Sequence, residues 1–200
     1  MIKNLVFDMG NVLIKWTPDL IMDYYHISDA QERALLKRIM FATVEWALLD
    51  WGKLNEIEAE KIFQSRLPKE YWHDIHNAMY WFDNVHSIDG MVDFIKHKKE
   101  QGFGIYLLSN APGFVETYKN YIPGIEYFDG IVISGNVGLV KPMPEIYQLL
   151  LQRFSLKAEE CLFVDDLTIN CAGALLQGMK SLVFRGDVKE IEDYLYELNA

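Results

Sequence analysis

Residues 2–13 of the chain read IKNLVFDMGNVL. The stretch from Ile2 to Phe7 is short, apolar at most positions and rich in residues that favour strands, which is typical of a strand covered on both faces in a parallel sheet. This strand ends at Asp8, and Gly10 follows two residues later. Because ligands of open parallel sheets bind outside the carboxyl ends of the strands, Asp8 is the first candidate for a functional side chain.

Further along the chain, strand patterns alternate with helix patterns. We expect four more strands, at residues 104–108, 128–134, 161–164 and 181–184, and helices at residues 87–102, 112–121, 144–153, 170–178 and from 188 onward. Alternating strands and helices indicate crossover connections and parallel pairing. The sequence therefore predicts an α/β fold with a Rossmann-like, doubly wound parallel sheet.

The segment that follows the first strand has helix signals throughout. Thr17 before Pro18 is typical of an N-cap with proline in the first turn. Residues 28–31 (SDAQ) read as a capping box, and residues 55–58 (NEIE) repeat that pattern more weakly. We therefore expect a helical cap domain at residues 16–86.

The length of 200 residues, half of them hydrophobic, is enough for one domain with a modest insertion. We expect an α/β core built from residues 1–15 and 87–200, with the helical cap inserted between these two parts.

The chain carries a formal net charge of −10. This balance argues against a nucleic-acid partner and against an anionic membrane surface, because both are bound through basic patches. It still allows a small anionic substrate where a cation reverses the sign locally. The partner we expect is a small phosphorylated metabolite, bound by a monomer or a homodimer.

The two cysteines, Cys161 and Cys171, have no metal-site spacing and do not make a disulfide framework, which favours a reducing compartment. The N-terminal stretch is interrupted by Asp8 and Asn11, so it does not read as a signal peptide. No run of about 18 apolar residues is present. We expect a cytoplasmic protein.

Polar residues follow each of the expected strands. They are Asp8, Ser109 with Asn110, a loop from residue 135 to Lys141, and Asp165 with Asp166. Carboxylates bind Mg²⁺, whereas lysine, serine and backbone N–H groups bind phosphate. Gathered at one edge of a sheet, these side chains predict a metal and phosphate site.

The same residues carry a resemblance to a known family. The strings FDMGNVL, LLSN, GLVKPMPEIY and FVDD, the last followed by Asn170 and by Gly178-Met179, resemble the four ordered motifs of the haloacid dehalogenase-like hydrolases. The resemblance covers the whole chain, because that family inserts its helical cap between the first two motifs.

The resemblance implies a role for each residue of the site. Asp8 would be the nucleophile, Ser109 a phosphate contact and Lys141 the group that neutralises charge. Further phosphate contacts would come from amides near Met9, Gly10 and Asn110. Mg²⁺ would be held by Asp8, the carbonyl of Gly10 and Asp166, with Asp165 acting through a water.

The chain departs from the commonest phosphatase pattern of this family at Gly10. In that pattern an aspartate at this position protonates the leaving oxygen and later activates water. Without it we expect slower turnover, or a substitute proton donor from the cap, the substrate or solvent. The sequence Asp-x-Gly-Asn-Val is similar to a subgroup that includes sugar-1-phosphate phosphatases, so we expect a Mg²⁺-dependent phosphatase acting on a sugar phosphate through an aspartyl phosphate.

Two other functions remain open. A 2-haloacid dehalogenase would use the same aspartate on carbon without a metal, but two adjacent carboxylates are a poor environment for a carboxylate substrate. A non-catalytic regulator could keep the metal site and lose turnover.

Some side chains allow both a structural and a functional interpretation. Asn170 could be a helix cap or part of the site, and a site role for Asn11 has less support. Asp50 and Lys53, on either side of Gly52, are the cap residues best placed to contact substrate.

The remaining candidates in the cap favour a structural interpretation. The aromatic residues at helical spacing more often form core than a sugar platform; they are Trp46, Trp51, Trp72, Tyr80 and Trp81. His73 and His76 lack a third metal ligand nearby in sequence. For Cys171, whose neighbours are acidic, we expect packing rather than nucleophilic chemistry.

Overall fold

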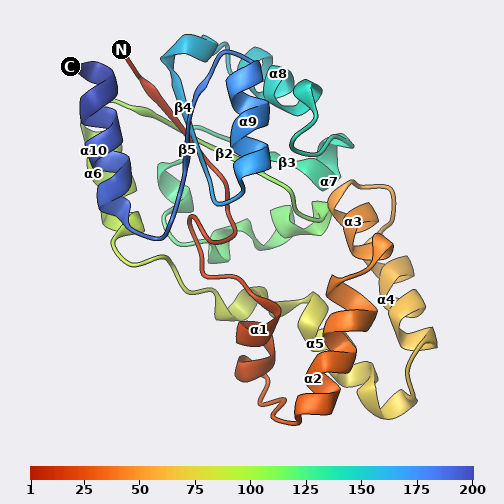
Figure 1. The fold of residues 1–200 in the computed structure, drawn as a ribbon. Coiled ribbons are helices and arrows are strands. Elements are labelled where there is room, and N and C mark those ends of the chain that lie inside the picture. The colour runs from red at the N-terminus through yellow and green to blue at the C-terminus, as the bar shows by residue number, and fades with distance from the viewer.

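The fold is a five-stranded parallel sheet covered by helices on both faces, with a second group of helices at one end (Figure 1). The computed structural model describes the backbone of residues 1–200 and all side chains except those of residues 83 and 84. The strands, in the spatial order β3-β2-β1-β4-β5, are β1 (Asn4–Phe7), β2 (Gly104–Ser109), β3 (Gly130–Ile133), β4 (Cys161–Asp165) and β5 (Lys180–Val183). All four neighbouring pairs are parallel, which confirms the doubly wound α/β fold.

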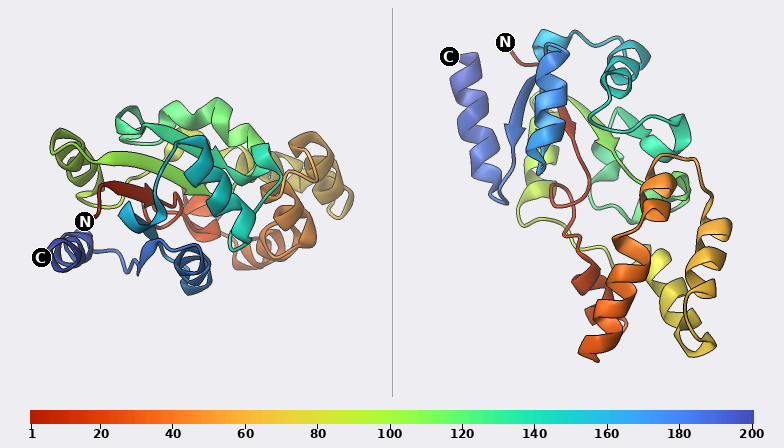
Figure 2. Two further views of the ribbon diagram at one scale, coloured as in Figure 1. Left: turned by 90° about the horizontal axis from the view of Figure 1, so that it is seen from above. Right: turned by 45° about the vertical axis from the view of Figure 1, so that its right-hand side comes forward.

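The two faces of the sheet pack against different helices. Helices α6 (Met91–Glu100) and α10 (Val188–Asn199) lie on one face, and α8 (Pro144–Arg153) and α9 (Thr168–Leu176) lie on the other (Figures 1 and 2). Successive side chains of a strand point to opposite faces. Within β1, Leu5 and Phe7 accordingly belong to the hydrophobic cluster on the α6 and α10 side, whereas Val6 belongs to the cluster beneath α8 and α9.

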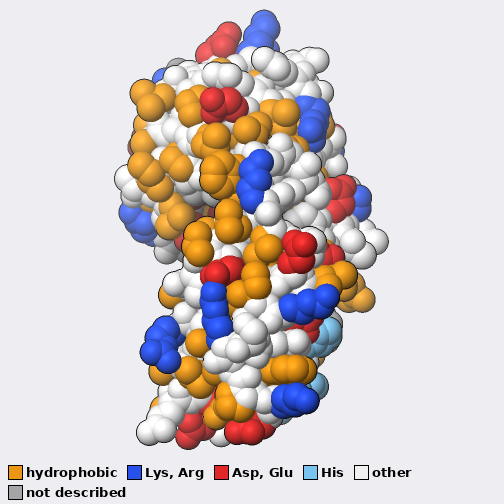
Figure 3. Space-filling view, turned by 90° about the vertical axis from the view of Figure 1, so that its right-hand side faces the viewer, with side chains coloured by type: hydrophobic (Ala, Val, Ile, Leu, Met, Phe, Trp, Pro, Cys, Tyr) orange, Lys and Arg blue, Asp and Glu red, His pale blue; other side chains and the backbone are white. Residues whose placement is uncertain are grey.

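The helical segment after β1 forms its own group of helices. Its elements are α1 (Pro18–Tyr24), α2 (Ala30–Leu36), a π-helical turn (Lys37–Phe41), α3 (Val44–Asp50), α4 (Glu56–Ser65), a 3₁₀ turn (Lys69–Tyr71), α5 (Trp72–Met79) and a second 3₁₀ turn (Trp81–Asn84). In Figure 3 these helices make the lower lobe, joined to the upper lobe at a waist, and charged side chains of both signs are interspersed over it.

The chain enters and leaves this group through two paired segments. Lys15 N–H donates to the carbonyl of His86 at 2.8 Å, and Ile88 N–H donates to the carbonyl of Leu13 at 2.9 Å. These bonds join the two crossing points close to the ends of the expected insertion at residues 16–86.

Two of the three helix starts that the capping signals predict agree with the structure. The hydroxyl of Thr17 accepts from Leu20 N–H at 3.1 Å, and the amide oxygen of Asn55 accepts from Glu58 N–H at 2.9 Å. The capping box expected at residues 28–31 is wrong: Asp29 is the N-cap of α2 and its carboxylate accepts from two backbone amides. A carboxylate is a strong N-cap, so the helix begins one residue later than expected.

Three expected elements of the core differ from the structure in their start, their helix type or their end, and the other bounds agree to within two residues. The helix expected from residue 87 begins at Met91, because Gly90 takes a left-handed φ of 77° and breaks the helical path. The segment Gly113–Tyr121 is 3₁₀ rather than α-helical. Strand β3 ends at Ile133, and Ser134 begins a short helix, α7 (Ser134–Val137), in place of the first part of the expected loop.

The remaining elements are short. They are 3₁₀ turns at Ile125–Tyr127 and Ala158–Glu160. Among the residues that the structure describes, no helix has both the length and the apolar character needed to cross a bilayer.

Candidate active site

Parallel register brings the first and last carboxylate motifs together. Phe7 of β1 pairs with Val164 of β4, so Asp8 and Asp165 follow aligned positions on neighbouring strands. The amide N–H of Asp8 donates to the carbonyl of Val164 at 2.9 Å. The two carboxylates therefore share one edge of the sheet because of backbone pairing.

Lys141 joins these two carboxylates. Its Nζ lies 2.7 Å from Asp8 Oδ1 and 2.6 Å from Asp165 Oδ2, and its side chain is 1% exposed. A buried ammonium group requires such partners, since an unpaired buried charge is very unfavourable. The three groups form a buried ion triad at the floor of the site.

Asn110 holds the backbone of Lys141 in place. Its side-chain amide donates to the Lys141 carbonyl at 2.9 Å and accepts from the Lys141 N–H at 2.8 Å. The sequence pointed to an amide near Asn110 as a phosphate contact, and the structure adds this side-chain contact, which links the end of β2 to the loop before α8.

A third carboxylate completes an acidic cluster. Oxygen atoms of Asp8, Asp165 and Asp166 lie within 4.8 Å of one another. Hard oxygen donors at this separation suit Mg²⁺. Only one ammonium, that of Lys141, contacts the cluster within the described residues, so a divalent cation would balance the remaining negative charge.

The two aspartates at the end of β4 have different surroundings. Asp165 is fully buried, and its oxygens accept from Leu167 N–H at 2.8 Å and from Asn170 Nδ2 at 3.1 Å, besides Lys141. Asp166 lines the cavity, and its Oδ2 accepts from Asn11 Nδ2 at 3.4 Å. Asp166 is therefore the carboxylate that faces the cavity, and Asp165 is the one held by donors of the protein.

The structure brings both asparagines considered in the sequence to the site. Asn170 is buried, and its backbone carbonyl accepts from Tyr147 Oη at 2.8 Å. Asn11 adopts a left-handed φ of 55°, and its Oδ1 accepts from Trp16 N–H at 3.1 Å. Each asparagine orients one aspartate of the pair.

Burial sets the protonation preferences of the site. It raises the pKa of Asp8 to about 6, with Lys141 opposing the rise and the charge of Asp165 adding to it. Burial also raises the pKa of Asp166, again with Asp165 adding and Asn11 opposing. For Lys141 burial lowers the pKa, but the charges of Asp8 and Asp165 outweigh it and the net direction is upward.

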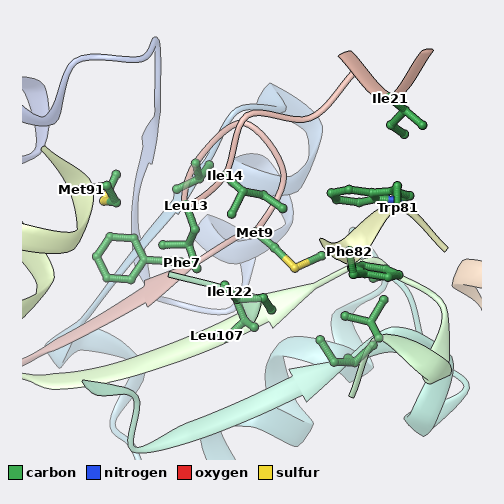
Figure 4. Close-up of a cluster of buried hydrophobic side chains, with 14 of the residues drawn as sticks. Phe7, Met9, Leu13, Ile14, Ile21, Trp81, Phe82, Met91, Leu107 and Ile122 are labelled. Atoms are coloured by element: carbon green, nitrogen blue, oxygen red, sulfur yellow. The ribbon is translucent and has the colours of Figure 1, made fainter. Parts of the chain in front are cut away.

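A cavity of about 400 Å³ lies above the cluster. We call its polar floor the strand-end rim; it consists of Asp8, Met9, Gly10, Ser109, Asn110, Lys141 and Asp166. We call the opposite side the apolar wall; it consists of Trp16, Trp46, Met79, Trp81, Phe82, Phe114 and Val115. In Figure 4 the side chain of Met9 points from the end of β1 toward Trp81 and Phe82. Every residue expected at the site, Asp165 apart, therefore lines one cavity between the sheet edge and the helical segment.

A contact between α3 and α7 went unpredicted. Ser134 Oγ donates to the backbone carbonyl of Asp50, and Trp51 Nε1 donates to the carbonyl of Gly138 at 2.9 Å. A Cβ on Gly52 would lie 2.2 Å from the carbonyl oxygen of Gly135, so only glycine allows this approach. We call these contacts the α3 anchor; Gly52 between Asp50 and Lys53 was the only signal of it in the sequence.

The anchor separates the two cap candidates that flank Gly52. Asp50 lines the cavity, whereas Lys53 is exposed and is not among the lining residues. Burial raises the pKa of Asp50 to about 7, with the charge of Asp8 adding to the rise and Lys141 opposing it.

The aromatic residues of the helical segment divide in the same way. Trp46 and Trp81 line the cavity. Trp51 belongs to the α3 anchor, and Trp72 Nε1 donates to the carbonyl of Gln64 at 3.0 Å. Tyr80 packs against Phe114 with ring centroids 5.5 Å apart.

The histidines and the cysteine near the fourth motif have structural partners. His73 Nε2 lies 3.1 Å from Asn77 Nδ2, and His76 Nδ1 lies 3.0 Å from Glu60 Oε1. Cys171 is buried, and its thiol lies 3.3 Å from the carbonyl of Leu182. Burial raises the pKa of that thiol to about 11, which agrees with a packing role.

Among curated relatives, the chain is 28% identical over 181 residues to D-ribitol-5-phosphate phosphatase of Bacteroides thetaiotaomicron, covering 85% of each chain. It is 26% identical over 182 residues to sesquiterpene phosphatase astK of Aspergillus oryzae, covering 90% of this chain and 88% of the relative. A further match, drimenol cyclase drtB of Aspergillus calidoustus, is 26% identical over 92% of this chain, which spans only about a third of that protein.

A solved structure shares the fold. A haloacid dehalogenase-like enzyme of Bacteroides thetaiotaomicron, in complex with magnesium and inorganic phosphate, superposes with a TM-score of 0.70 at 21% identity, covering 96% of this chain and 99% of that one. The family model for haloacid dehalogenase-like hydrolases matches residues 2–175. With four motifs gathered at one cavity and this match over most of its length, the chain belongs to the haloacid dehalogenase-like hydrolases.

Proposed function

We propose that this hydrolase is a Mg²⁺-dependent phosphatase that acts on a small phosphomonoester through an aspartyl phosphate on Asp8. The observation that carries the proposal is the position of Asp8: its carboxylate lies beside Lys141 and within the acidic cluster, at the floor of a cavity large enough for a small molecule. Two relatives named as phosphatases, and the solved structure that holds magnesium and phosphate, support the same reaction class.

The chain offers a suitable set of donors for Mg²⁺. Asp8, Asp166 and the carbonyl of Gly10 would hold the ion, and Asp165 would act through a water. The bound ion would supply charge neutralisation between the carboxylates and the phosphate, and would polarise the phosphoryl oxygens.

The protein residues then carry the reaction in two steps. A carboxylate oxygen of Asp8 attacks phosphorus and the bond to the ester oxygen breaks, which leaves an acyl phosphate on Asp8. Water then attacks phosphorus, the bond between phosphorus and the Asp8 oxygen breaks, and inorganic phosphate leaves while the carboxylate of Asp8 is restored. Lys141, the Ser109 hydroxyl and the amides near Met9, Gly10 and Asn110 would stabilise the charge that spreads over the equatorial oxygens.

The helical segment would act as the cap of this site. We propose a core of residues 1–15 and 87–200 and a cap of residues 16–86. The paired segments near Lys15 and His86 support this division, since they join the two crossing points of the chain. A cap in this position would exclude bulk water and contact the leaving group.

Phosphate release measured with and without chelator tests the proposal against its two rivals. We expect release from small aryl and acyl phosphates with Mg²⁺, and none in EDTA. A 2-haloacid dehalogenase would release halide from 2-chloropropionate with or without chelator, and a non-catalytic regulator would release neither product. Asp8→Asn should abolish phosphate release while the far-UV circular dichroism spectrum stays unchanged; undiminished turnover would contradict the role of Asp8.

The alcohol part of the substrate, which leaves in the first step, is not fixed by the reaction class. The sequence favours a sugar phosphate, whereas the names of the relatives extend from a sugar-alcohol phosphate to a sesquiterpene phosphate. The cavity itself offers further grounds for a choice.

A further inference from the structure

The side of the cavity that faces away from the strand ends is almost entirely apolar. Four of the seven side chains of the apolar wall come from the helical segment beyond α1, two come from the core segment after β2, and Trp16 comes from the stretch between β1 and α1. Among the lining side chains that the structure describes, Asp50 is the one charged group outside the strand-end rim.

Aromatic contacts hold this wall in one arrangement. Trp81 stacks on Phe82 with ring centroids 4.6 Å apart, and Trp16 lies 6.5 Å from Trp81. Phe82 meets Phe114 edge-on at 5.9 Å. These contacts join the cap segment to the core segment, so the wall is formed before a ligand binds.

The composition of the wall decides which alcohols it accepts. Each sugar hydroxyl placed against it would lose water and find few partners, and an unpaired buried polar group is unfavourable. An apolar alcohol would lose only ordered water at the same surface. Building on the phosphatase function proposed above, we infer that the substrate is the monophosphate ester of an apolar, unhydroxylated alcohol. This departs from the sugar phosphate that the sequence favours.

A substrate series tests this inference. Octyl phosphate and benzyl phosphate, compared with glucose 1-phosphate and ribitol 5-phosphate, should show kcat/KM values higher by about 100-fold or more. Equal or higher values for the two polyols would overturn the inference. If neither these esters nor acetyl phosphate release phosphate, the phosphatase function itself is contradicted. If acetyl phosphate is hydrolysed and the alkyl esters are not, only the inference about the alcohol is contradicted.

A pair of tryptophan variants tests the wall directly. Trp46 lines the cavity, whereas the indole of Trp72 is bonded to backbone carbonyls of its own lobe. Trp46→Ala should lower the ratio of octyl phosphate to glucose 1-phosphate activity about tenfold, and Trp72→Ala should leave that ratio unchanged. The ratio is measured within one variant, so a partial loss of folded protein does not affect it. An unchanged ratio in Trp46→Ala would contradict the inference.

A second inference rests on a different observation, the position of Asp50. The α3 anchor fixes the backbone of Asp50 against α7 through the bond from Ser134 to its carbonyl. Its carboxyl group lies in the same cavity as Asp8 and Lys141 and interacts with the charges of both. Gly10 leaves the first motif without an acid or base, and Asp50 is the carboxyl group that the fold brings to the other side of the cavity.

We propose that Asp50 performs the proton transfers of the reaction. Its carboxyl proton passes to the ester oxygen as the P–O bond breaks, so the alcohol leaves neutral. The resulting carboxylate takes a proton from the water that attacks the acyl phosphate, which restores the starting state. Alkyl alcohols are strongly basic leaving groups, so a substrate of the inferred class requires this proton.

Leaving groups of different basicity test the role of Asp50. In Asp50→Asn, kcat for benzyl phosphate should fall about 100-fold or more, whereas kcat for p-nitrophenyl phosphate should fall far less because nitrophenolate leaves without a proton. Asp50→Glu should restore part of the benzyl phosphate activity. Equal losses for both substrates would show a structural role and overturn the proposal.

Ser134→Ala is the matched control for the anchor. It loosens the backbone of Asp50 and keeps the carboxyl group, so the selective loss for benzyl phosphate should be smaller than in Asp50→Asn. A selective loss in Ser134→Ala as large as that in Asp50→Asn, or larger, would contradict proton transfer by the carboxyl group.

Discussion

The two sides of the cavity are held in place by different means. On the strand-end rim, Asp8 directly follows the paired strand β1. The backbone of Lys141 is held by a hydrogen bond to the side chain of Asn110, at the end of β2. On the apolar wall, Trp46, Trp81 and Phe114 come from segments far apart in sequence that meet only through packing. The rim therefore depends on hydrogen-bond register, and the wall depends on how one lobe docks on the other.

This difference matters for what each side can contribute. A reaction centre needs charged groups held at fixed separations, and parallel register provides them. A binding wall needs shape and apolar surface, which many packings supply. Substitutions at the rim should therefore cause large losses of turnover or stability. Substitutions at the wall should have smaller effects, mainly on which substrate is preferred. We expect the largest losses at the charged rim and at the α3 anchor, and smaller effects from side chains that support or face the charged groups.

The largest effect on stability should come from the buried lysine of the rim. Lys141→Met leaves Asp8 and Asp165 without their shared cation, and the loss of one partner from a buried ion group costs about 3–5 kcal/mol. Urea denaturation of the protein in EDTA measures this cost. Lys53→Met, at an exposed position of the helical segment after β1, is the control and should change stability by less than about 0.5 kcal/mol. Equal costs for the two variants would break the contrast between rim and surface.

The α3 anchor should tolerate even a small substitution poorly. Gly52→Ala places a Cβ against the Gly135 carbonyl at a φ of 68°, and strain together with the clash should cost about 2–4 kcal/mol. Gly102→Ala is the matched control: its φ is 88° and a Cβ there meets nothing within 4 Å, so it should cost about 1 kcal/mol. Thermal melting compares the two. A cost for Gly52→Ala no larger than the control would show that the anchor does not hold the lobes together.

The sequence could predict the strand-end rim but not the α3 anchor. The strands, their parallel pairing and the meeting of Asp8, Ser109, Lys141 and the Asp165-Asp166 pair at one edge follow from the strand patterns and the polar residues after them, because parallel register places strand ends at the same edge. The α3 anchor does not follow, since the Ser134 hydroxyl contacts a carbonyl 84 residues away and no local pattern marks it. For the apolar wall, the sequence identified aromatic residues at helical spacing. It could not tell which of them line the cavity and which pack elsewhere.

Some local errors have equally physical reasons. Asp29 and Ser28 are both good N-caps, and only the path of the chain decides between them. Gly90, with its left-handed φ, delays the helix expected from residue 87 until Met91, and the chain turns into α7 at Ser134, the last residue of the expected strand. The Asn110 contact with Lys141 could not be predicted, because the two residues are distant in sequence.

A smaller effect should come from the residue that orients the buried aspartate of the pair. Asn170→Ala removes the amide that contacts both oxygens of Asp165, and loss of such supporting contacts typically weakens metal binding about 10- to 100-fold. Isothermal titration with Mg²⁺ measures the change without turnover. Gln148→Ala, at an exposed side chain that donates to Gln177, should leave the affinity unchanged. An unaltered Mg²⁺ affinity in Asn170→Ala would contradict a role for Asp165 in the metal site.

The smallest effect concerns the pH dependence of stability. The folded protein raises the pKa of Asp50 from 3.8 to about 7, so it binds more protons than the unfolded chain in this range. Stability is therefore greatest below pH 4 as far as Asp50 is concerned, and falls as pH rises toward 7; Asp8, with a pKa near 6, acts in the same direction. In EDTA, Asp50→Asn should reduce the loss of stability between pH 5 and 8 by about 1–2 kcal/mol.

Urea titrations at the two pH values measure that difference. Asp187→Asn, at the N-cap of α10 on the protein surface, is the control and should leave the pH dependence between 5 and 8 as it is in the parent protein. Parallel pH profiles for the parent and Asp50→Asn would contradict the half-buried, cavity-facing position of this carboxyl group.

The most direct test is to detect the phosphorylated form of the enzyme during turnover. Acid quenching of the protein with acetyl phosphate and Mg²⁺, followed by peptide mass spectrometry, should find one phosphoryl group on the peptide that contains Asp8. The adduct should be missing in EDTA and in Asp8→Asn. Phosphate release that proceeds at full rate without a phosphoryl group on Asp8 would contradict the central claim that this carboxylate is the nucleophile.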